Sequence, residues 1–177
     1  IEVHVYRNDL NGGTGTFKDI AASLAASIFN EIGLKQYCIA STGNSATAYA
    51  KYLSMANVNC SVFMPEDAIK TSEATISSYG QQVFRVLGDY AKAKEIAAGY
   101  AKIYNIPMST GNIDPIRIEA KKTMVFEWMR QTGKLPDVYI QAVSGGTGPL
   151  AIDKGIRELN QIMPELKNPR MILVQTD

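Results

Sequence analysis

The sequence predicts an α/β fold in two lobes, each a three-layer arrangement of helices around a mainly parallel sheet. Short apolar runs alternate along the chain with amphipathic stretches of roughly 10–15 residues, which is typical of βαβ units. The chain has 177 residues, of which 46% are hydrophobic and 20% are charged. This length and composition predict a globular, water-soluble protein with one ordinary domain or two small ones.

Each element follows from its own local pattern. Strands are expected at the apolar runs, in chain order residues 1–6, 36–40, 60–64, 83–87, 106–108, 138–143 and 171–174. Helices are expected at the stretches between them, residues 19–32, 45–56, 65–79, 89–103, 116–132 and 150–160. Gly33 ends the first helix, because glycine readily adopts the left-handed conformation that follows helix C-termini. Asp89 caps the fourth helix, since its carboxylate can accept hydrogen bonds from first-turn N–H groups.

These units fall into two groups. Residues 36–110 form a smaller, mobile α/β lobe, which interrupts a larger lobe made of residues 1–35 and 111–177. A crevice between two such lobes is a usual small-molecule site, because ligands bind at the carboxyl ends of parallel strands. Both ends of the sequence fall at strand patterns, so we expect a protein truncated at both ends.

Charge and cysteine content exclude several classes of function. The 18 basic and 17 acidic residues give a formal net charge of +1, which does not indicate a nucleic-acid or membrane partner. No apolar run is long enough to span a bilayer, and no signal-peptide pattern opens the chain. Cys38 and Cys60 do not make a disulfide framework, which favours a reducing, cytoplasmic location. With His4 as the only histidine, no metal site is expected.

The first candidate segment is Asn11-Gly-Gly-Thr-Gly-Thr-Phe-Lys-Asp19, which places Lys18 directly after a glycine-rich turn. A lysine sheltered beside backbone amides can act as a free amine, because burial disfavours an ammonium ion. Such an amine can form a Schiff base with a carbonyl group. The alternative is an ordinary surface lysine near a helix start.

The second candidate segment is Ser41-Thr-Gly-Asn-Ser-Ala46, which follows the strand at residues 36–40. It combines hydroxyl groups, an amide side chain and the N–H groups of a helix N-terminus. Backbone donors and the helix dipole both favour negative charge there, so a carboxylate could bind. The alternative is a strand-to-helix turn in which a serine or asparagine caps the helix.

The third candidate segment is Gln141-Ala-Val-Ser-Gly-Gly-Thr-Gly-Pro149, between a strand and a helix. Its glycines allow the backbone to turn tightly and to direct several N–H groups at one phosphate. Residues 146–151 also fit the loose dinucleotide pattern G-x-G-x-x-G/A, with Asp177 as a candidate ribose-binding acid. The P-loop pattern is absent from the sequence.

Together the three segments resemble the fold-type II pyridoxal-phosphate enzymes, whose fold is that of the tryptophan synthase β subunit. The resemblance rests on Thr14-Gly-Thr-Phe-Lys-Asp19, Ser41-Thr-Gly-Asn-Ser45 and Ser144-Gly-Gly-Thr-Gly148, in the family's order along the chain. Within the family, the segments Ile118-Glu-Ala-Lys-Lys-Thr-Met-Val-Phe-Glu127 and Pro169-Arg-Met-Ile-Leu-Val-Gln175 are most similar to threonine synthases. Gly15-Thr-Phe-Lys-Asp-Ile20 also resembles the archaeal cysteate synthases.

The resemblance implies pyridoxal 5'-phosphate as the cofactor and a role for each segment. Lys18 would hold the cofactor as an imine and move the substrate α-proton, and Asn44 would bind the cofactor's phenolic oxygen. The residues implied for the cofactor phosphate are Ser144, Gly145, Gly146, Thr147 and Gly148. The residues implied for the substrate carboxylate are Ser41, Thr42, Gly43 and Ser45. The lobe of residues 1–35 and 111–177 would then bind most of the cofactor.

The implied reaction is β/γ-elimination and replacement on a phosphorylated amino acid, in a homodimer. The leading prediction is a threonine synthase, which converts O-phosphohomoserine and water to threonine and phosphate. The first alternative is a cysteate-synthase-like replacement on phosphoserine by sulfite. Alternatives of another class are a nicotinamide-dependent oxidoreductase and a non-catalytic lobe of the same fold.

Overall fold

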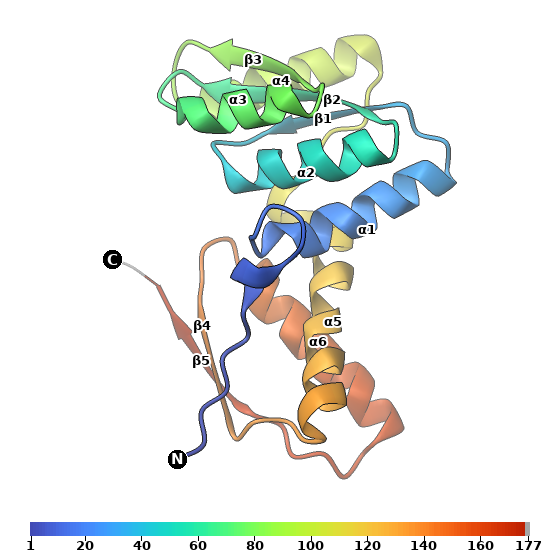
Figure 1. The fold of residues 1–177 in the computed structure, drawn as a ribbon, viewed down its shortest axis with the longest axis vertical. Helices are drawn as coiled ribbons and strands as arrows, with labels where there is room; N and C mark the ends of the chain where they lie inside the picture. Colours follow the sequence, from blue (N-terminus) through green and yellow to red (C-terminus); the bar gives the residue numbers. More distant parts are fainter. Residues whose placement is uncertain (176–177) are drawn as a thin grey trace. The chain divides into compact units, whose positions relative to one another are not determined.

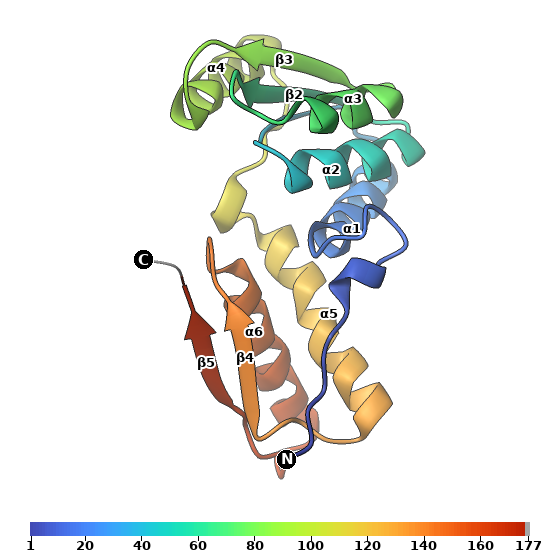
Figure 2. The same ribbon diagram turned by 60° about the vertical axis from the view of Figure 1, so that its left-hand side comes forward.

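The computed structural model describes residues 1–175, and the chain divides into two compact units, Ile1–Ser109 and Thr110–Asp177 (Figures 1 and 2). Each unit contains its own parallel sheet and its own packed helices. The predicted α/β class with parallel sheets is therefore confirmed. The grouping of residues 1–35 with 111–177 stays a prediction.

The first unit is built on three parallel strands in the order β1-β2-β3. These strands are β1 (Gln36–Ala40), β2 (Asn59–Pro65) and β3 (Gln82–Val86). The segment expected at residues 106–108 extends this sheet by a single parallel bridge between Met108 and Cys38. The Cys38 N–H donates to the Pro107 carbonyl over 2.9 Å, and the Ser109 N–H donates to the Cys38 carbonyl over 2.9 Å.

Helices cover both faces of this sheet, because successive side chains of a strand point to opposite faces. They are α1 (Lys18–Glu31), α2 (Asn44–Met55), α3 (Lys70–Ser78) and α4 (Tyr90–Tyr104). Tyr37 of β1 stacks on Tyr49 of α2 with 5.9 Å between ring centroids, whereas the next residue, Cys38, packs with Ala97 of α4. Helix α1 packs on α2 outside this layer (Figure 1).

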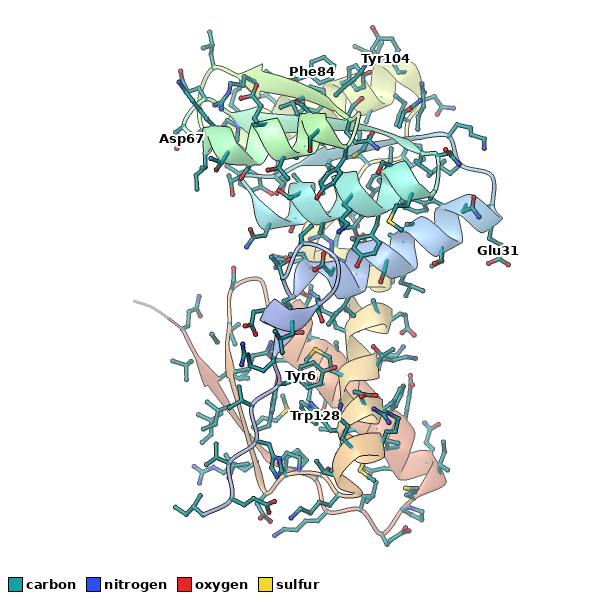
Figure 3. All side chains as sticks on the ribbon, in the orientation of Figure 1. Tyr6, Glu31, Asp67, Phe84, Tyr104 and Trp128 are labelled. Carbon is teal, nitrogen blue, oxygen red and sulfur yellow. The ribbon has the colours of Figure 1, made fainter. Side chains whose placement is uncertain are left out.

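Aromatic rings fill the space between β3 and α4. Phe63 stacks on Phe84 at 4.8 Å, and Tyr100 contacts both Phe84 and Tyr104, at 5.6 Å and 4.6 Å between centroids. Phe84 and Tyr104 lie on neighbouring elements in Figure 3. Cys38 lies in this core, where burial raises the pKa of its thiol to about 11. The thiol is therefore protonated at neutral pH.

The second unit consists of α5 (Pro115–Thr132), β4 (Val138–Ala142), α6 (Thr147–Ile162) and β5 (Arg170–Val174). Strands β4 and β5 are parallel neighbours joined through α6. Helices α5 and α6 pack closely at Gly155, where a Cβ atom would lie 2.9 Å from the Lys122 carbonyl oxygen. Trp128 of α5, labelled in Figure 3, packs against Tyr139 of β4 with 5.0 Å between ring centroids.

The predicted helix ends are confirmed where capping chemistry marks them. The Asp89 carboxylate accepts a hydrogen bond from the Lys92 N–H over 2.9 Å, and Gly33 has φ +70° after α1. Asp114 caps α5 in the same way, over 3.0 Å to the Ile116 N–H, with Pro115 at the first helical position. Two short 3-10 helices, Asn8–Leu10 and Gly111–Ile113, precede α1 and α5.

Three element predictions need correction. The strand expected at residues 1–6 is wrong: the segment has no regular structure and Ile1, Val3 and Val5 are exposed. Its alternating β-branched pattern favours a strand, but within residues 1–175 no strand pairs with it. The third helix begins at Lys70 instead of residue 65, because Pro65 ends β2. Helix α6 begins at Thr147, earlier than the expected residue 150.

Over the described part of the chain, no helix is both long and apolar enough to cross a membrane.

Candidate active site

Lys18 is the first residue of α1 and directly follows the glycine-rich loop of residues 11–16. Its side chain is half-buried, and its Nζ lies 5.5 Å from the centroid of the Phe17 ring. Its backbone N–H donates to Thr16 Oγ1 over 3.2 Å. The position of Lys18 therefore depends on the conformation of the loop before it.

A buried carboxylate holds that loop. Asp19 is 2% exposed, and its two oxygens accept hydrogen bonds from the Thr14 N–H (2.8 Å), the Thr14 hydroxyl (2.7 Å) and the Thr16 N–H (3.1 Å). The charge also lies in the first turn of α1, where the helix dipole stabilises an anion. Asp19 thus fixes the backbone immediately before Lys18.

Helix α2 also contacts this loop. Lys51 Nζ donates to the Gly13 carbonyl over 2.6 Å. Gly13 itself lies against Tyr52, since a Cβ atom at this position would come within 2.3 Å of the phenolic oxygen. Burial raises the pKa of Tyr52, and the negative charge of Asp19 raises it further. The loop is therefore a fixed part of the first unit.

Substituting Gly13 with alanine tests this close packing. The new methyl group would meet Tyr52 at 2.3 Å and the Asp19 carboxyl at 2.7 Å, so we expect the free energy of unfolding to fall by about 1–3 kcal/mol. Gly12→Ala is the matched control, because no atom lies within 4 Å of its Cβ position. Equal melting temperatures for the two variants would contradict this account of the loop.

The second predicted segment forms the turn between β1 and α2. Ser41 is buried, and its hydroxyl oxygen accepts hydrogen bonds from the Gly43 N–H (3.3 Å) and the Ala46 N–H (3.2 Å). Thr42 and Asn44 are exposed, and Asn44 is the first residue of α2. Ser41 thus accepts a hydrogen bond from a first-turn N–H group of α2, as expected for a strand-to-helix turn stabilised by a serine. The segment still presents first-turn N–H groups of α2.

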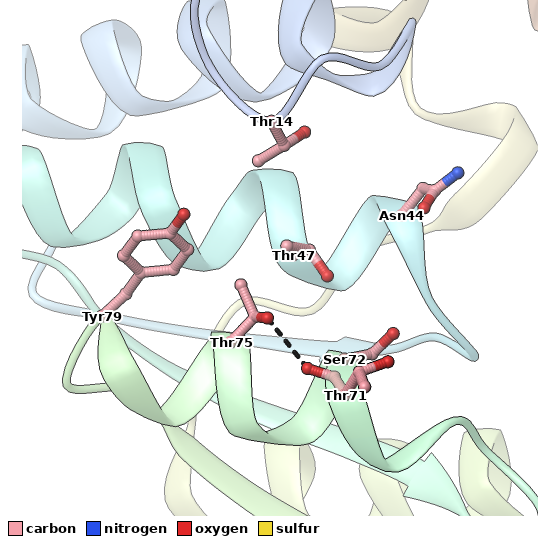
Figure 4. Close-up of a pocket in the computed structure, with 7 residues that line it drawn as sticks. All are labelled: Thr14, Asn44, Thr47, Thr71, Ser72, Thr75 and Tyr79. Carbon is pink, nitrogen blue, oxygen red and sulfur yellow. Dashed lines mark hydrogen bonds between the residues drawn. The ribbon is translucent and has the colours of Figure 1, made fainter.

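Asn44 and the lysine loop border the same open hollow of the first unit (Figure 4). Asn44 and Thr47 line it from α2, and Thr14 lines it from the loop. The remaining lining residues come from α3 and the residue after it, and all carry hydroxyl groups: Thr71, Ser72, Thr75 and Tyr79. The hollow is polar but without charged side chains, which suits neutral hydrogen-bonding groups.

The glycine loop of the third segment lies in the second unit, between β4 and α6. Gly146 has φ +79°, a left-handed conformation that favours glycine. At Gly145 a Cβ atom would lie 2.2 Å from the Asn112 amide, and at Gly148 it would lie 2.4 Å from Gln141 Nε2. Thr147 begins α6, so the first N–H groups of this helix belong to the loop. Such a glycine-rich helix start is suited to bind a phosphate.

The predicted site residues do not include those that hold these loops in place. Asp19 is predicted only as part of a motif, although an acid in the first turn of a helix is a recognisable stabilising signal. Lys51 and Asn112 could not be found from local patterns, because their contacts are with residues distant in the sequence. Asp177, the candidate acid of the dinucleotide alternative, lies outside the described residues.

Comparison with known proteins bears on the identity of these loops. The chain is similar to threonine synthase of Methanocaldococcus jannaschii, with 31% identity over 97% of this chain and 42% of that protein. It is also similar to threonine synthase of Halalkalibacterium halodurans, with 32% identity over 84% of this chain and 42% of that protein. The chain thus spans less than half the length of these curated relatives.

Solved structures share the fold. A threonine deaminase from Solanum lycopersicum superimposes with a TM-score of 0.79 and 22% identity, over 96% of this chain and 45% of that chain. A pyridoxal 5'-phosphate-dependent aspartate racemase superimposes with a TM-score of 0.75 and 25% identity, over 89% of this chain and 46% of that chain. The family described as pyridoxal-phosphate dependent enzyme matches residues 1–177. Since that match extends over the whole chain, the protein belongs to the pyridoxal-phosphate-dependent enzyme family, whose members with this fold are of fold type II.

Proposed function

We propose that this chain is part of a threonine synthase, which converts O-phosphohomoserine and water to threonine and phosphate. The observation that carries the proposal is the identity of about 30% to curated threonine synthases over nearly the whole chain. The fixed loop before Lys18 supports it from the structure, because a reactive lysine must be held in one place to act on a bound substrate.

The residues present fit pyridoxal 5'-phosphate, the cofactor of the family. Lys18 supplies a primary amine at the end of a fixed loop, and Asn44 supplies an exposed amide beside that loop. In the second unit, the glycine loop of residues 144–148 leaves no room for a Cβ atom at Gly145 or Gly148 unless a neighbouring side chain moves. Its first-turn N–H groups give the donor set that a phosphate needs.

Each residue has a separate task in this proposal. The Lys18 amine would hold the cofactor and would move the proton at the substrate Cα. The bound cofactor supplies an electron sink for the negative charge that develops at Cα. The Asn44 amide orients the cofactor ring, and residues 144–148 hold the phosphate.

The turn at Ser41, Thr42, Gly43 and Ser45 is proposed to bind the substrate carboxylate. Ser41 already accepts two N–H donors, and a serine hydroxyl has two acceptor lone pairs and one proton. Its O–H is thus left to donate, and a carboxylate accepts such a bond. The exposed Thr42 side chain adds a second hydroxyl donor at the same turn.

The same proposal includes the division into lobes, the oligomeric state, the cellular location and the ligand of the glycine loop. Residues 1–35 and 111–177 form part of the larger cofactor-binding lobe, and residues 36–110 form a smaller, mobile lobe. The enzyme works as a homodimer in the cytoplasm. The family match favours the cofactor phosphate over a dinucleotide as the ligand of residues 144–148.

The reaction can be tested on the full-length protein by two linked measurements. Supplied with O-phosphohomoserine, it should release inorganic phosphate and form threonine in equal amounts. The alternative, a cysteate-synthase-like enzyme, would release phosphate only from phosphoserine together with sulfite. A protein that binds the cofactor but transforms neither substrate would contradict both and favour a non-catalytic lobe.

A further inference from the structure

A buried lysine of the second unit has no role in the function described so far. Lys121 lies on α5 and is 1% exposed. Its neighbours along the helix, Ala120, Met124 and Val125, are also buried, as are Ala151 and Ile152 on α6. Lysine is almost never fully buried unless its charge is paired, because removing an ammonium ion from water is costly. Lys121 therefore belongs to the packed interior of the second unit.

One contact of Lys121 is with the glycine loop. Its Nζ donates to Thr147 Oγ1 over 2.6 Å, and Thr147 is itself only 7% exposed. Thr147 is the first residue of α6 and belongs to the loop of residues 144–148. A threonine hydroxyl that accepts a bond from lysine keeps its own proton to donate. The pair thus brings a cation and a polarised hydroxyl donor to the start of α6.

We propose that Lys121 compensates the charge of the cofactor phosphate, acting through Thr147 and through its own positive charge. A phosphate monoester carries about −1.5 to −2 charge near neutral pH, which is more than the partial charge at a helix N-terminus can balance. A buried cation that donates to Thr147 adds positive charge at this loop. This inference rests on the proposed role of residues 144–148.

The competing explanation is that Lys121 only links α5 to α6 through its bond to Thr147. Two variants separate the explanations. Lys121→Met removes the charge and the hydrogen bond while keeping a long side chain, and Lys121→Gln keeps a hydrogen-bond donor without the charge. Lys122→Met is the matched control, because the neighbouring lysine instead pairs with Glu119 (2.7 Å) and Glu158 (2.9 Å).

The test is a binding titration of the full-length apoprotein with two ligands that differ only in phosphate. Pyridoxal 5'-phosphate and pyridoxal are added to each variant, and the visible absorbance of the covalently bound ligand is followed. Lys121→Met should lower the affinity for pyridoxal 5'-phosphate by about tenfold to a hundredfold, while the affinity for pyridoxal changes little. Lys121→Gln should retain part of the affinity, and Lys122→Met should match the wild type for both ligands.

Two results would overturn the inference. Equal weakening of both ligands would assign Lys121 to packing alone, and unchanged affinity for both would show that its charge does not act on the phosphate. If the wild type bound neither ligand, the proposed cofactor function itself would fail, which is a distinct outcome. Thermal melting of each apoprotein verifies folding, and Lys121→Gln carries the test if Lys121→Met does not fold.

Discussion

Replacing Lys18 with alanine should abolish the visible absorbance of the cofactor-loaded, full-length protein and lower turnover by about 10³-fold or more. The reason is that the variant loses both the covalent link to the cofactor and the amine that moves the Cα proton. Asp19 fixes the loop before Lys18, so this amine is held at one place in the first unit. Absorbance spectroscopy and a phosphate-release assay measure the two losses.

Lys35→Ala is the matched control for this substitution. Lys35 is an exposed lysine of the same unit, so its removal should leave spectrum and turnover unchanged. If Lys18→Ala keeps a visible band of full intensity while Lys35→Ala loses it, the assignment of the cofactor lysine is wrong.

Replacing Asp19 with alanine should lower the free energy of unfolding of the first unit by roughly 3–5 kcal/mol. Its buried carboxylate accepts three hydrogen bonds. A hydrogen bond to a charged group contributes about 1.5–3 kcal/mol, and the three contributions add to less than their sum because they share one carboxylate. Without it, the N–H groups of Thr14 and Thr16 lose their acceptor, and the loop before Lys18 is released. Denaturant unfolding measures the loss.

Two further variants serve as an intermediate case and a control for that result. Asp19→Asn keeps the shape of the side chain but has only one acceptor oxygen. Its free energy of unfolding should therefore lie between those of Asp19→Ala and the wild type. Asp9→Ala removes an exposed acid paired with Arg7 and should leave stability close to wild type. If all three variants unfold at the same denaturant concentration, Asp19 does not hold the loop.

Much of the fold could be predicted from sequence because its signals are local. The apolar runs at β1, β2 and β3 and the caps at Asp89 and Gly33 depend on residues close together in the chain. The strand expected at residues 1–6 failed because a strand also needs a partner, which no local pattern reports. Within residues 1–175 it has none.

The candidate site likewise contains residues marked by local motifs and residues identified only by long-range contacts. Lys18, Asn44 and the glycine loop could be found because each lies at the start of a helix in a recognisable motif. The residues that fix them could not be found, since Lys51 contacts Gly13 and Lys121 contacts Thr147 across long sequence separations. Such contacts are set by how helices pack, so they become visible only in the folded structure.

The most direct test of the central claim, that Lys18 carries the cofactor, is peptide mapping of the full-length protein. The protein would be loaded with pyridoxal 5'-phosphate, treated with borohydride to make the link permanent, digested and analysed by mass spectrometry. We expect the added mass on the peptide containing Lys18, in near-stoichiometric amount. Stoichiometric addition at another lysine, or no addition in a folded protein, would contradict it.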